Sequence, residues 1–234
     1  MGDLVSIVTA ILSQSERQVE ISGQNIANMA TTGYKRRVSF SQILATPAGD
    51  IQYEPVISTV QDFADGKVMQ SKNPLDLALV GHGFFTVQGP GGPLYTRQGG
   101  FTRDTEGRLV TTQGYPLQAD GGGDLTLKSE NVVVQADGTV LDGGEPVGRI
   151  AVAAFTDPRT LREVTGGLFA APDGVATAVA KPTIRQGALE ASNVSTGDEM
   201  ISIMAALRRA ESGQRLMGVY DDLMGRALAA FGQV

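Results

Sequence analysis

Residues 199–231 have the sequence EMISIMAALRRAESGQRLMGVYDDLMGRALAAF. Apolar side chains recur there at alternating steps of three and four residues, at Met200, Ile203, Leu207, Ala210, Met217, Met224, Leu228 and Phe231. The same steps place Gln214 and Asp221 on this line as its polar members. Such a period predicts an amphipathic helix with one narrow apolar seam of the kind that coiled coils use.

The N-terminal end of the chain repeats this pattern. Its seam consists of Val5, Val8, Leu12, Val19, Ile26 and Met29, with Ser15 and Ser22 as the polar members. Charged residues such as Glu16 and Arg208 lie on the opposite faces, so each helix has one polar side and one apolar stripe. Two interpretations remain open: the helices pack inside a single globule, or they are buried between molecules, because such helices gain most of their stability from packing.

The middle of the chain has the composition of a β domain. Glycine accounts for 30 of the 234 residues, well above the usual ~7%. Short β-type runs occupy residues 75–80, 84–88, 94–97, 108–112, 125–128, 132–135 and 149–155. Turn signals at Asp104–Gly107 and Asp137–Gly138 separate some of these runs. An antiparallel meander or small barrel is the expected arrangement.

These patterns together predict an α+β fold with four segments. An N-terminal helix is expected over residues 1–30 and an extended connector, punctuated by Pro47 and Pro55, over 31–65. The central, mainly antiparallel β domain is expected over 66–185, and the second helix lies within 186–234. The two terminal helices are expected to pack in a coiled-coil-like manner.

Composition excludes several classes of function. The net charge of −6 and a sequence pI near 4.8 offer no basic face for nucleic acid. Residues 1–15 lack the basic start of a cleaved signal peptide, and no run approaches the ~18 apolar residues of a membrane span. The chain has no cysteine and a single histidine, His82, so neither a disulfide framework nor a typical zinc site is expected.

The sequence also contains few residue patterns that are typical of a catalytic site. No nucleophile elbow and no phosphate-binding glycine loop occurs, and most aspartates adjoin a glycine or a predicted turn, where aspartate is favoured for local reasons. We therefore expect no catalytic residue, no cofactor, no metal and no small-molecule substrate. Two rival hypotheses are a carbohydrate-binding β domain with helical oligomerisation arms and a carboxylate enzyme; the absence of tryptophan weakens the first.

Four blocks of the sequence resemble one family. Residues 22–35 contain SGQNIAN followed by TTGYK, residues 66–85 read GKVMQSKNPLDLALVGHGFF, residues 95–114 contain YTR, GGFT and GRLVT, and residues 187–200 contain GALEASNV and EM. In this order the blocks resemble the bacterial flagellar basal-body rod and hook proteins. The positions carrying the resemblance are Asn25, Ile26, Ala27, Asn28, Thr32, Gly33, Tyr34, Lys35, Asn73, Pro74, Leu75, Asp76, Gly83, Phe84, Phe85, Ser192, Asn193 and Val194.

The resemblance implies a structural axial subunit. In such proteins the terminal helices form the inner core layer that encloses the export channel of a hollow drive shaft, and the β domain lies outside it. Expected partners are the chain itself and other rod proteins, with the inner-membrane ring or export gate as further candidates. The resemblance also implies type III export and a place in the basal-body rod that spans the periplasm. The length of 234 residues favours a proximal-rod subunit, with a distal-rod or hook-type subunit as the alternative.

Motif residues next to the helices have two interpretations each. Asn25, Asn28 and Gly33 are expected to end the first helix and redirect the chain, with Gly33 in a left-handed conformation; the rival is a ligand site made by the two asparagines. The polar seam positions Ser15, Ser22, Gln214 and Asp221 either specify register among neighbours or are simply exposed to solvent.

Overall fold

The computed structural model describes residues 2–43, 55–129 and 131–231. The chain divides into two compact units. The helical unit consists of Met1–Ala27, Arg37–Gln61 and Ser195–Val234, and the β unit consists of Asn28–Arg36 and Asp62–Val194. Each unit is therefore built from segments that are distant in the sequence.

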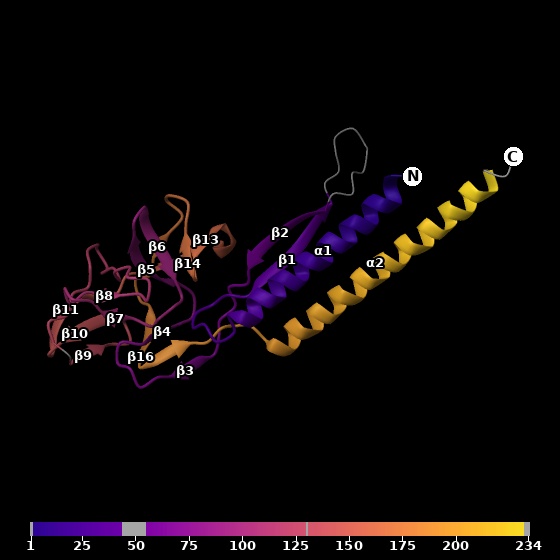
Figure 1. Cartoon of the computed structure of the whole chain (residues 1–234). Coiled ribbons are helices and arrows are strands. Elements are labelled where there is room, and N and C mark those ends of the chain that lie inside the picture. The colour runs from indigo at the N-terminus through magenta and orange to yellow at the C-terminus, as the bar shows by residue number, and fades with distance from the viewer. Residues whose placement is uncertain (1, 44–54, 130, 232–234) are drawn as a thin grey trace. The chain divides into compact units, whose positions relative to one another are not determined.

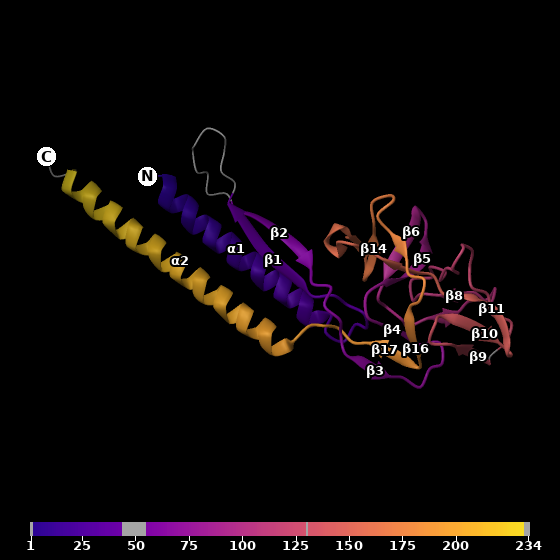
Figure 2. The same cartoon turned by 180° about the vertical axis from the view of Figure 1, so that it is seen from behind.

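Two helices and a hairpin form the helical unit (Figure 1). Helix α1 spans Gly2–Ala27 and helix α2 spans Thr196–Phe231. They lie side by side and antiparallel, with the two chain ends at the same end of the unit in both views (Figure 2). At 36 residues against 26, α2 is the longer, and its last turns extend past the start of α1. Neither described helix is long and apolar enough to cross a membrane.

The expected connector contains a β-hairpin. Strand β1 (Arg37–Ile43) pairs antiparallel with β2 (Pro55–Gln61), in register from Arg37↔Gln61 to Ile43↔Pro55. The hairpin contacts α1, since the Ser39 hydroxyl donates a hydrogen bond to Oε1 of Gln18 over 2.6 Å. Of the two expected punctuating prolines, Pro55 begins β2 and Pro47 lies outside the described residues.

Over its described residues, the β unit is built from short strands and one 3₁₀ turn. The strands are β3 (Val68–Gln70), β4 (Leu77–Val80), β5 (Phe84–Gly89), β6 (Gly92–Thr96), β7 (Thr102–Arg103), β8 (Leu109–Val110), β9 (Val132–Val134), β10 (Thr139–Asp142), β11 (Glu145–Arg149), β12 (Val152–Ala154), β13 (Arg162–Thr165), β14 (Leu168–Ala170), β15 (Thr177–Ala178), β16 (Thr183–Gln186) and β17 (Ala188–Glu190), with η1 at Pro158–Thr160. Glycines at the turns account for the high glycine content, as at Gly138, which turns β9 into β10 with φ 88°.

The pairing of these strands confirms the predicted antiparallel architecture. The largest sheet has the order β13-β14-β6-β5-β12-β15, and a second has the order β11-β10-β9. Every pairing between neighbouring strands of these two sheets is antiparallel. The run at 125–128, predicted as a strand, does not form a regular strand, and Thr126 forms an isolated bridge with Arg108. Backbone hydrogen bonds also hold this run in place, such as the one that the Leu125 N–H donates to the Leu117 carbonyl oxygen over 3.1 Å.

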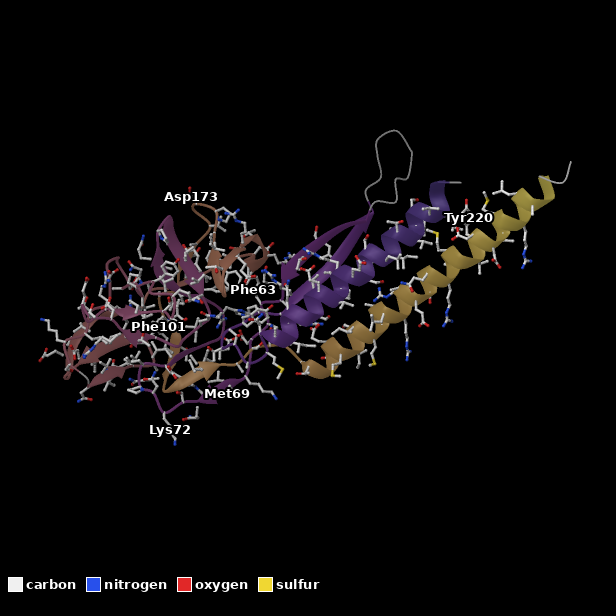
Figure 3. All side chains as sticks on the ribbon, viewed as in Figure 1. Phe63, Met69, Lys72, Phe101, Asp173 and Tyr220 are labelled. Atoms are coloured by element: carbon white, nitrogen blue, oxygen red, sulfur yellow. The ribbon has the colours of Figure 1, made fainter. Side chains whose placement is uncertain are left out.

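Two consecutive phenylalanines on β5 anchor a core on each face of the main sheet. Successive side chains of a strand point to opposite faces, and accordingly Phe85 joins one apolar cluster while Phe84 joins the other. Phe85 packs edge-to-face on Phe101, with ring centroids 5.4 Å apart, and Phe101 lies among the packed side chains of this unit (Figure 3). Phe84 packs in the same manner on Phe63, at 5.5 Å. The GFF motif therefore supplies one core side chain to each face of the main sheet.

Candidate assembly interface

A line of buried residues on each helix joins α1 to α2. On α1, Val8, Ser15 and Ser22 recur every seven residues and are 1%, 4% and 0% exposed. On α2, Glu199, Ala206 and Gly213 recur at the same interval and are buried as well. Residues seven apart lie on one face of an α-helix, so these two lines are the faces through which α1 and α2 meet. Small side chains on both lines let the helices approach closely.

At Gly213, helix α2 lies directly against α1. A Cβ atom at this position would lie 3.5 Å from a methyl carbon of Ile11, 3.7 Å from one of Val8 and 3.8 Å from one of Leu12. These separations are ordinary van der Waals distances, so a methyl group fits there and a larger side chain does not.

Gly213→Ala is accordingly expected to be tolerated. Alanine is favoured over glycine within a helix by about 0.8–1 kcal/mol, and the space at Gly213 accepts one methyl group. Helix content and thermal stability, followed by far-ultraviolet circular dichroism, should be unchanged or slightly raised. Gly213→Leu is the contrast: it should lower both, because α1 must move away from α2. Equal behaviour of the two variants would contradict this packing.

Asn25 connects the two helices at the point where α1 ends and α2 begins. Its Nδ2 donates hydrogen bonds to the Arg37 carbonyl oxygen at 2.9 Å and to Oε1 of Glu199 at 3.2 Å, and its Oδ1 accepts one from the Arg37 N–H at 2.9 Å. The Asn25 side chain is fully buried. One motif asparagine thus connects α1, β1 and the first turn of α2, which is a structural use of the side chain.

The segment that follows α1 contains the predicted turn. Asn28 accepts two hydrogen bonds from Thr31: one to its carbonyl oxygen from the Thr31 N–H, at 3.0 Å, and one to its Oδ1 from the Thr31 hydroxyl, at 3.3 Å. Gly33 has φ 68°, the expected left-handed conformation, and a Cβ there would lie 2.5 Å from the backbone carbon of Arg97. Both the backbone angle and this close approach require glycine.

An ion cluster is buried in the β unit. Nζ of Lys35 lies 2.7 Å from Oε1 of Glu190, and Nη1 of Arg97 lies 3.3 Å from Oε2 of the same carboxylate. Nη2 of Arg97 also pairs with the half-exposed Asp65, at 3.2 Å. Burial lowers the pKa of Lys35 from 10.5, and the nearby Glu190 carboxylate opposes that shift.

Hydrogen bonds to the backbone complete this cluster. The Gly66 N–H donates to Oε1 of Glu190 at 2.8 Å, the Gly33 N–H donates to the Glu190 carbonyl oxygen at 2.8 Å, and Nζ of Lys35 donates to the Ala64 carbonyl oxygen at 2.7 Å. The cluster therefore ties together three parts of the chain: the residues after α1, the segment before β3 and the strand β17. These partners offset much of the cost of burying the charges, although Nε of Arg97 is buried without a hydrogen-bond partner among the described residues.

Asn193, which follows β17, forms further hydrogen bonds to the residues after α1 and to the segment before β3. Its Oδ1 accepts a hydrogen bond from the Arg36 N–H at 2.7 Å, and its Nδ2 donates to the carbonyl oxygens of Asp62 at 2.8 Å and Ala64 at 3.1 Å. The neighbouring Ser192 caps the backbone locally through the Val194 N–H, at 3.2 Å. The SNV motif thus fixes the chain where it leaves the β unit.

The NPLD motif forms a closed turn. Nδ2 of Asn73 donates to Oδ1 of Asp76 at 2.9 Å, the Ser71 hydroxyl donates to Oδ2 of Asp76 at 2.5 Å, and the Leu75 N–H donates to Oδ1 of Asn73 at 3.1 Å. Pro74 lies exposed within this turn. The Asp76 carboxylate is thus used by its own turn. Within the described ranges, no group of three or more acidic or histidine side chains is placed to hold a metal ion.

The remaining predicted positions differ in exposure. On α1 and just beyond it, Val5, Ala27 and Met29 are exposed, whereas Leu12, Val19, Ile26 and Thr32 are partly buried and Tyr34 is buried. On α2, Ile203, Ala210, Met217 and Met224 are partly buried, whereas Met200, Leu207, Gln214, Asp221 and Leu228 are exposed. The side chain of Phe231 lies outside the described ones. The line of α2 that meets α1 is thus displaced by one residue from Met200, Leu207 and Gln214.

Some of the residues that organise these contacts were not singled out from the sequence. Arg97, Glu190 and Asp65 form the ion cluster with Lys35, and Ala206 and Gly213 form the close helix contact. A seven-residue recurrence of small side chains on both helices was the available signal for the second group. Arg97 and Glu190 lie within the YTR and GALEASNV blocks, but the sequence gave no indication that they meet Lys35, because these residues are far apart along the chain.

Comparison with known proteins supplies the identity of these blocks. Residues 78–144 match the family model described as the flagellar hook protein FlgE/F/G D1 domain, and residues 185–230 match the flagellar basal body rod FlgEFG protein C-terminal model. The chain is 34% identical over 228 residues to the flagellar basal-body rod protein FlgF of Caulobacter vibrioides, covering 93% of each chain. It is 29% identical to FlgF of Escherichia coli, covering 92% of each chain, and 29% identical to the rod protein FlgG of Borreliella burgdorferi, covering 92% of this chain and 94% of the relative.

Proposed function

The chain belongs to the family of bacterial flagellar basal-body rod proteins, and on that premise we propose that it polymerises through its two terminal helices as a subunit of the proximal rod. As a rod protein of the basal body it is a structural component, not an enzyme, and it assembles with other flagellar rod components. In the proposed assembly the segments 1–30 and 186–234 form an inner, coiled-coil-like layer around the export channel. The connector 31–65 and the β domain 66–185 lie outside that layer.

The observation that carries this proposal is the apolar surface left open on α2. Met200, Leu207 and Leu228, three of the predicted seam residues, are 56%, 57% and 67% exposed. Helices of this kind are stable when their apolar side chains are buried by packing. Within the helical unit α1 covers only one side of α2, so the remaining apolar side chains require other subunits. A rod supplies such neighbours along its whole length.

The bonds that join three chain segments within the β unit fit a subunit that transmits torque. The buried ion cluster and Asn193 join three chain segments by side-chain bonds with lengths between 2.7 and 3.3 Å. A buried network of this kind favours one arrangement of the segments that it joins. In the proposed rod, load on the β unit would therefore be shared among many bonds at once.

The proximal position and the surroundings are part of the proposal. Similarity to relatives named FlgF supports the proximal rod, and similarity to FlgG keeps a distal-rod position as the alternative. The proposed rod crosses the periplasm, and its proximal end adjoins the inner-membrane ring or the export gate. The hypothesis of a carbohydrate-binding protein outside the family is not favoured by these relatives.

Deletion of the gene tests the proposal. We expect non-motile cells whose basal bodies lack the distal rod and hook, with both restored by a plasmid copy. Quantitative mass spectrometry of purified basal bodies should find the chain in cells that lack the distal-rod subunit. Its absence there, with normal incorporation in complete basal bodies, would place it in the distal rod. Normal motility of the deletion strain would contradict a rod role altogether.

A further inference from the structure

A pocket opens in the β unit beside the aromatic cluster on one face of the main sheet. Its volume is about 390 Å³, at the small end of the range for ligand pockets. Three phenylalanines and three polar side chains line it, all from the β unit: Phe63, Phe84, Phe155, His82, Arg97 and Thr156. We call it the Arg97 pocket. The rod function proposed above leaves it unassigned.

Phenyl rings form the apolar wall of the Arg97 pocket. Phe84 packs edge-to-face with Phe63 (labelled in Figure 3), at a centroid distance of 5.5 Å, and with Phe155 at 5.6 Å. Phe84 and Phe155 are buried, whereas Phe63 is partly exposed. A further ring that enters the pocket can extend this set of edge-to-face contacts, which aromatic pairs prefer. The wall therefore favours an aromatic group over an aliphatic one.

One N–H group of Arg97 lacks an acceptor. The side chain is 3% exposed. Its Nη1 donates hydrogen bonds to the Leu79 carbonyl oxygen and to Oε2 of Glu190. Its Nη2 donates to the Gly81 carbonyl oxygen and to Oδ1 of Asp65. Nε, in contrast, is buried and has no hydrogen-bond partner among the described residues. An unpaired buried donor is costly, so an acceptor on a bound group is favoured here.

The charges around Arg97 favour an uncharged acceptor. Lys35 and Arg97 carry two positive charges, and Glu190 and Asp65 carry two negative ones, so the ion cluster is already neutral. A bound carboxylate would bring a third negative charge close to two others, which is unfavourable in a buried site. A carbonyl oxygen accepts the same hydrogen bond and adds no charge.

We propose that the Arg97 pocket binds one aromatic residue from the peptide chain of a partner protein. The ring lies against the three phenylalanines, and a backbone carbonyl next to that ring accepts a hydrogen bond from Nε of Arg97. Phenylalanine within a peptide supplies a ring and a neutral carbonyl in one small, uncharged unit, which suits the volume of the pocket. The β unit thereby has a point of attachment of its own, which does not depend on the proposed rod function.

Capped amino acids test the site by NMR in the full-length chain. The Nε–H signal of Arg97 is assigned through bonds to its own side-chain carbons, and N-acetyl-phenylalaninamide should shift it saturably. N-acetyl-alaninamide keeps the carbonyl groups without the ring, and toluene keeps the ring without a carbonyl. Each should bind at least about tenfold more weakly, because one loses the ring contacts and the other leaves Nε unpaired.

Two outcomes of the titration would overturn the proposal. One is an Arg97 Nε–H signal that stays in place at saturating N-acetyl-phenylalaninamide, or an absence of binding, since Nε then has another acceptor such as a buried water. The other is equal binding of the phenylalanine and alanine probes, because the rings of the wall would then take no part.

Two variants supply an independent measurement. Phe63→Leu removes one ring and keeps the position apolar, so it should weaken binding of the phenylalanine probe by about threefold or more. The matched control is Phe40→Leu on β1 of the helical unit, where the ring is 41% exposed, and its affinity should be unchanged. Equal affinity of the Phe63 and Phe40 variants would contradict the assigned wall.

Arg97→Lys keeps the positive charge and removes the Nε–H group. It should abolish the preference for N-acetyl-phenylalaninamide over toluene, and a preference that persists would show that Nε is not the donor. If Arg97→Lys does not fold, the Nε–H signal of the unaltered chain and the Phe63→Leu variant still decide.

Discussion

Glu190→Gln is expected to lower the unfolding free energy of the β unit by about 3–5 kcal/mol, the usual cost of removing one partner from a buried ion pair. The carboxylate of Glu190 is 2% exposed and is the shared partner of the buried cations Lys35 and Arg97. Without it both positive charges remain in the interior with too little compensation. Urea unfolding followed by near-ultraviolet circular dichroism of the buried Tyr34 and Tyr95 would measure the loss.

Two further variants make this prediction specific. Asp65→Asn removes the half-exposed member of the cluster, and we expect a loss below about 1 kcal/mol because water screens that pair. Adding Lys35→Met to Glu190→Gln should recover part of the stability, since one of the two uncompensated cations disappears; the difference from additivity measures the coupling. An equal loss for Asp65→Asn and Glu190→Gln would contradict a cluster centred on Glu190.

The sequence predicted the terminal helices and the antiparallel β unit because both have short-range periodicity. It did not predict the β1–β2 hairpin: residues 31–65 offered few periodic cues, and the structure shows that the strands are placed by contacts such as Ser39 with Gln18 on α1. Such a contact depends on two segments folding together. Local patterns carry no information about it.

The helix contact shows a second limit of periodicity. Over residues 200–207 every position but Ser202 is apolar, so neighbouring lines on the helix are equally plausible by hydrophobicity. The contact with α1 uses Glu199, Ala206 and Gly213. Ala206 and Gly213 lie in this contact because they are small, and Glu199 lies there because it accepts a hydrogen bond from Asn25. Close approach favours small residues, whereas an apolar pattern favours large ones. The larger neighbours Met200 and Leu207 are left for other contacts.

Val8→Asp is expected to abolish motility while leaving the β unit folded. Val8 is 1% exposed and lies against Gly213, so an aspartate there buries an unpaired carboxylate between the helices, at a cost of more than about 3 kcal/mol. Far-ultraviolet circular dichroism should show reduced helix content. Near-ultraviolet signals of the β unit should be unchanged, because Val8 belongs to the helical unit.

Leu207→Asp separates assembly from folding. Its side chain is 57% exposed, so the new carboxylate remains solvated in the free subunit and helix content should match that of the unaltered chain. Motility should nevertheless be lost, because burying the same carboxylate against a neighbour on assembly is unfavourable. Gln214→Asp, also at an exposed and already polar position, is the matched control and should affect motility less. Normal motility of Leu207→Asp at normal abundance would mean that this face of α2 stays open to water in the rod, and the apolar side chains on it would then need an explanation other than assembly.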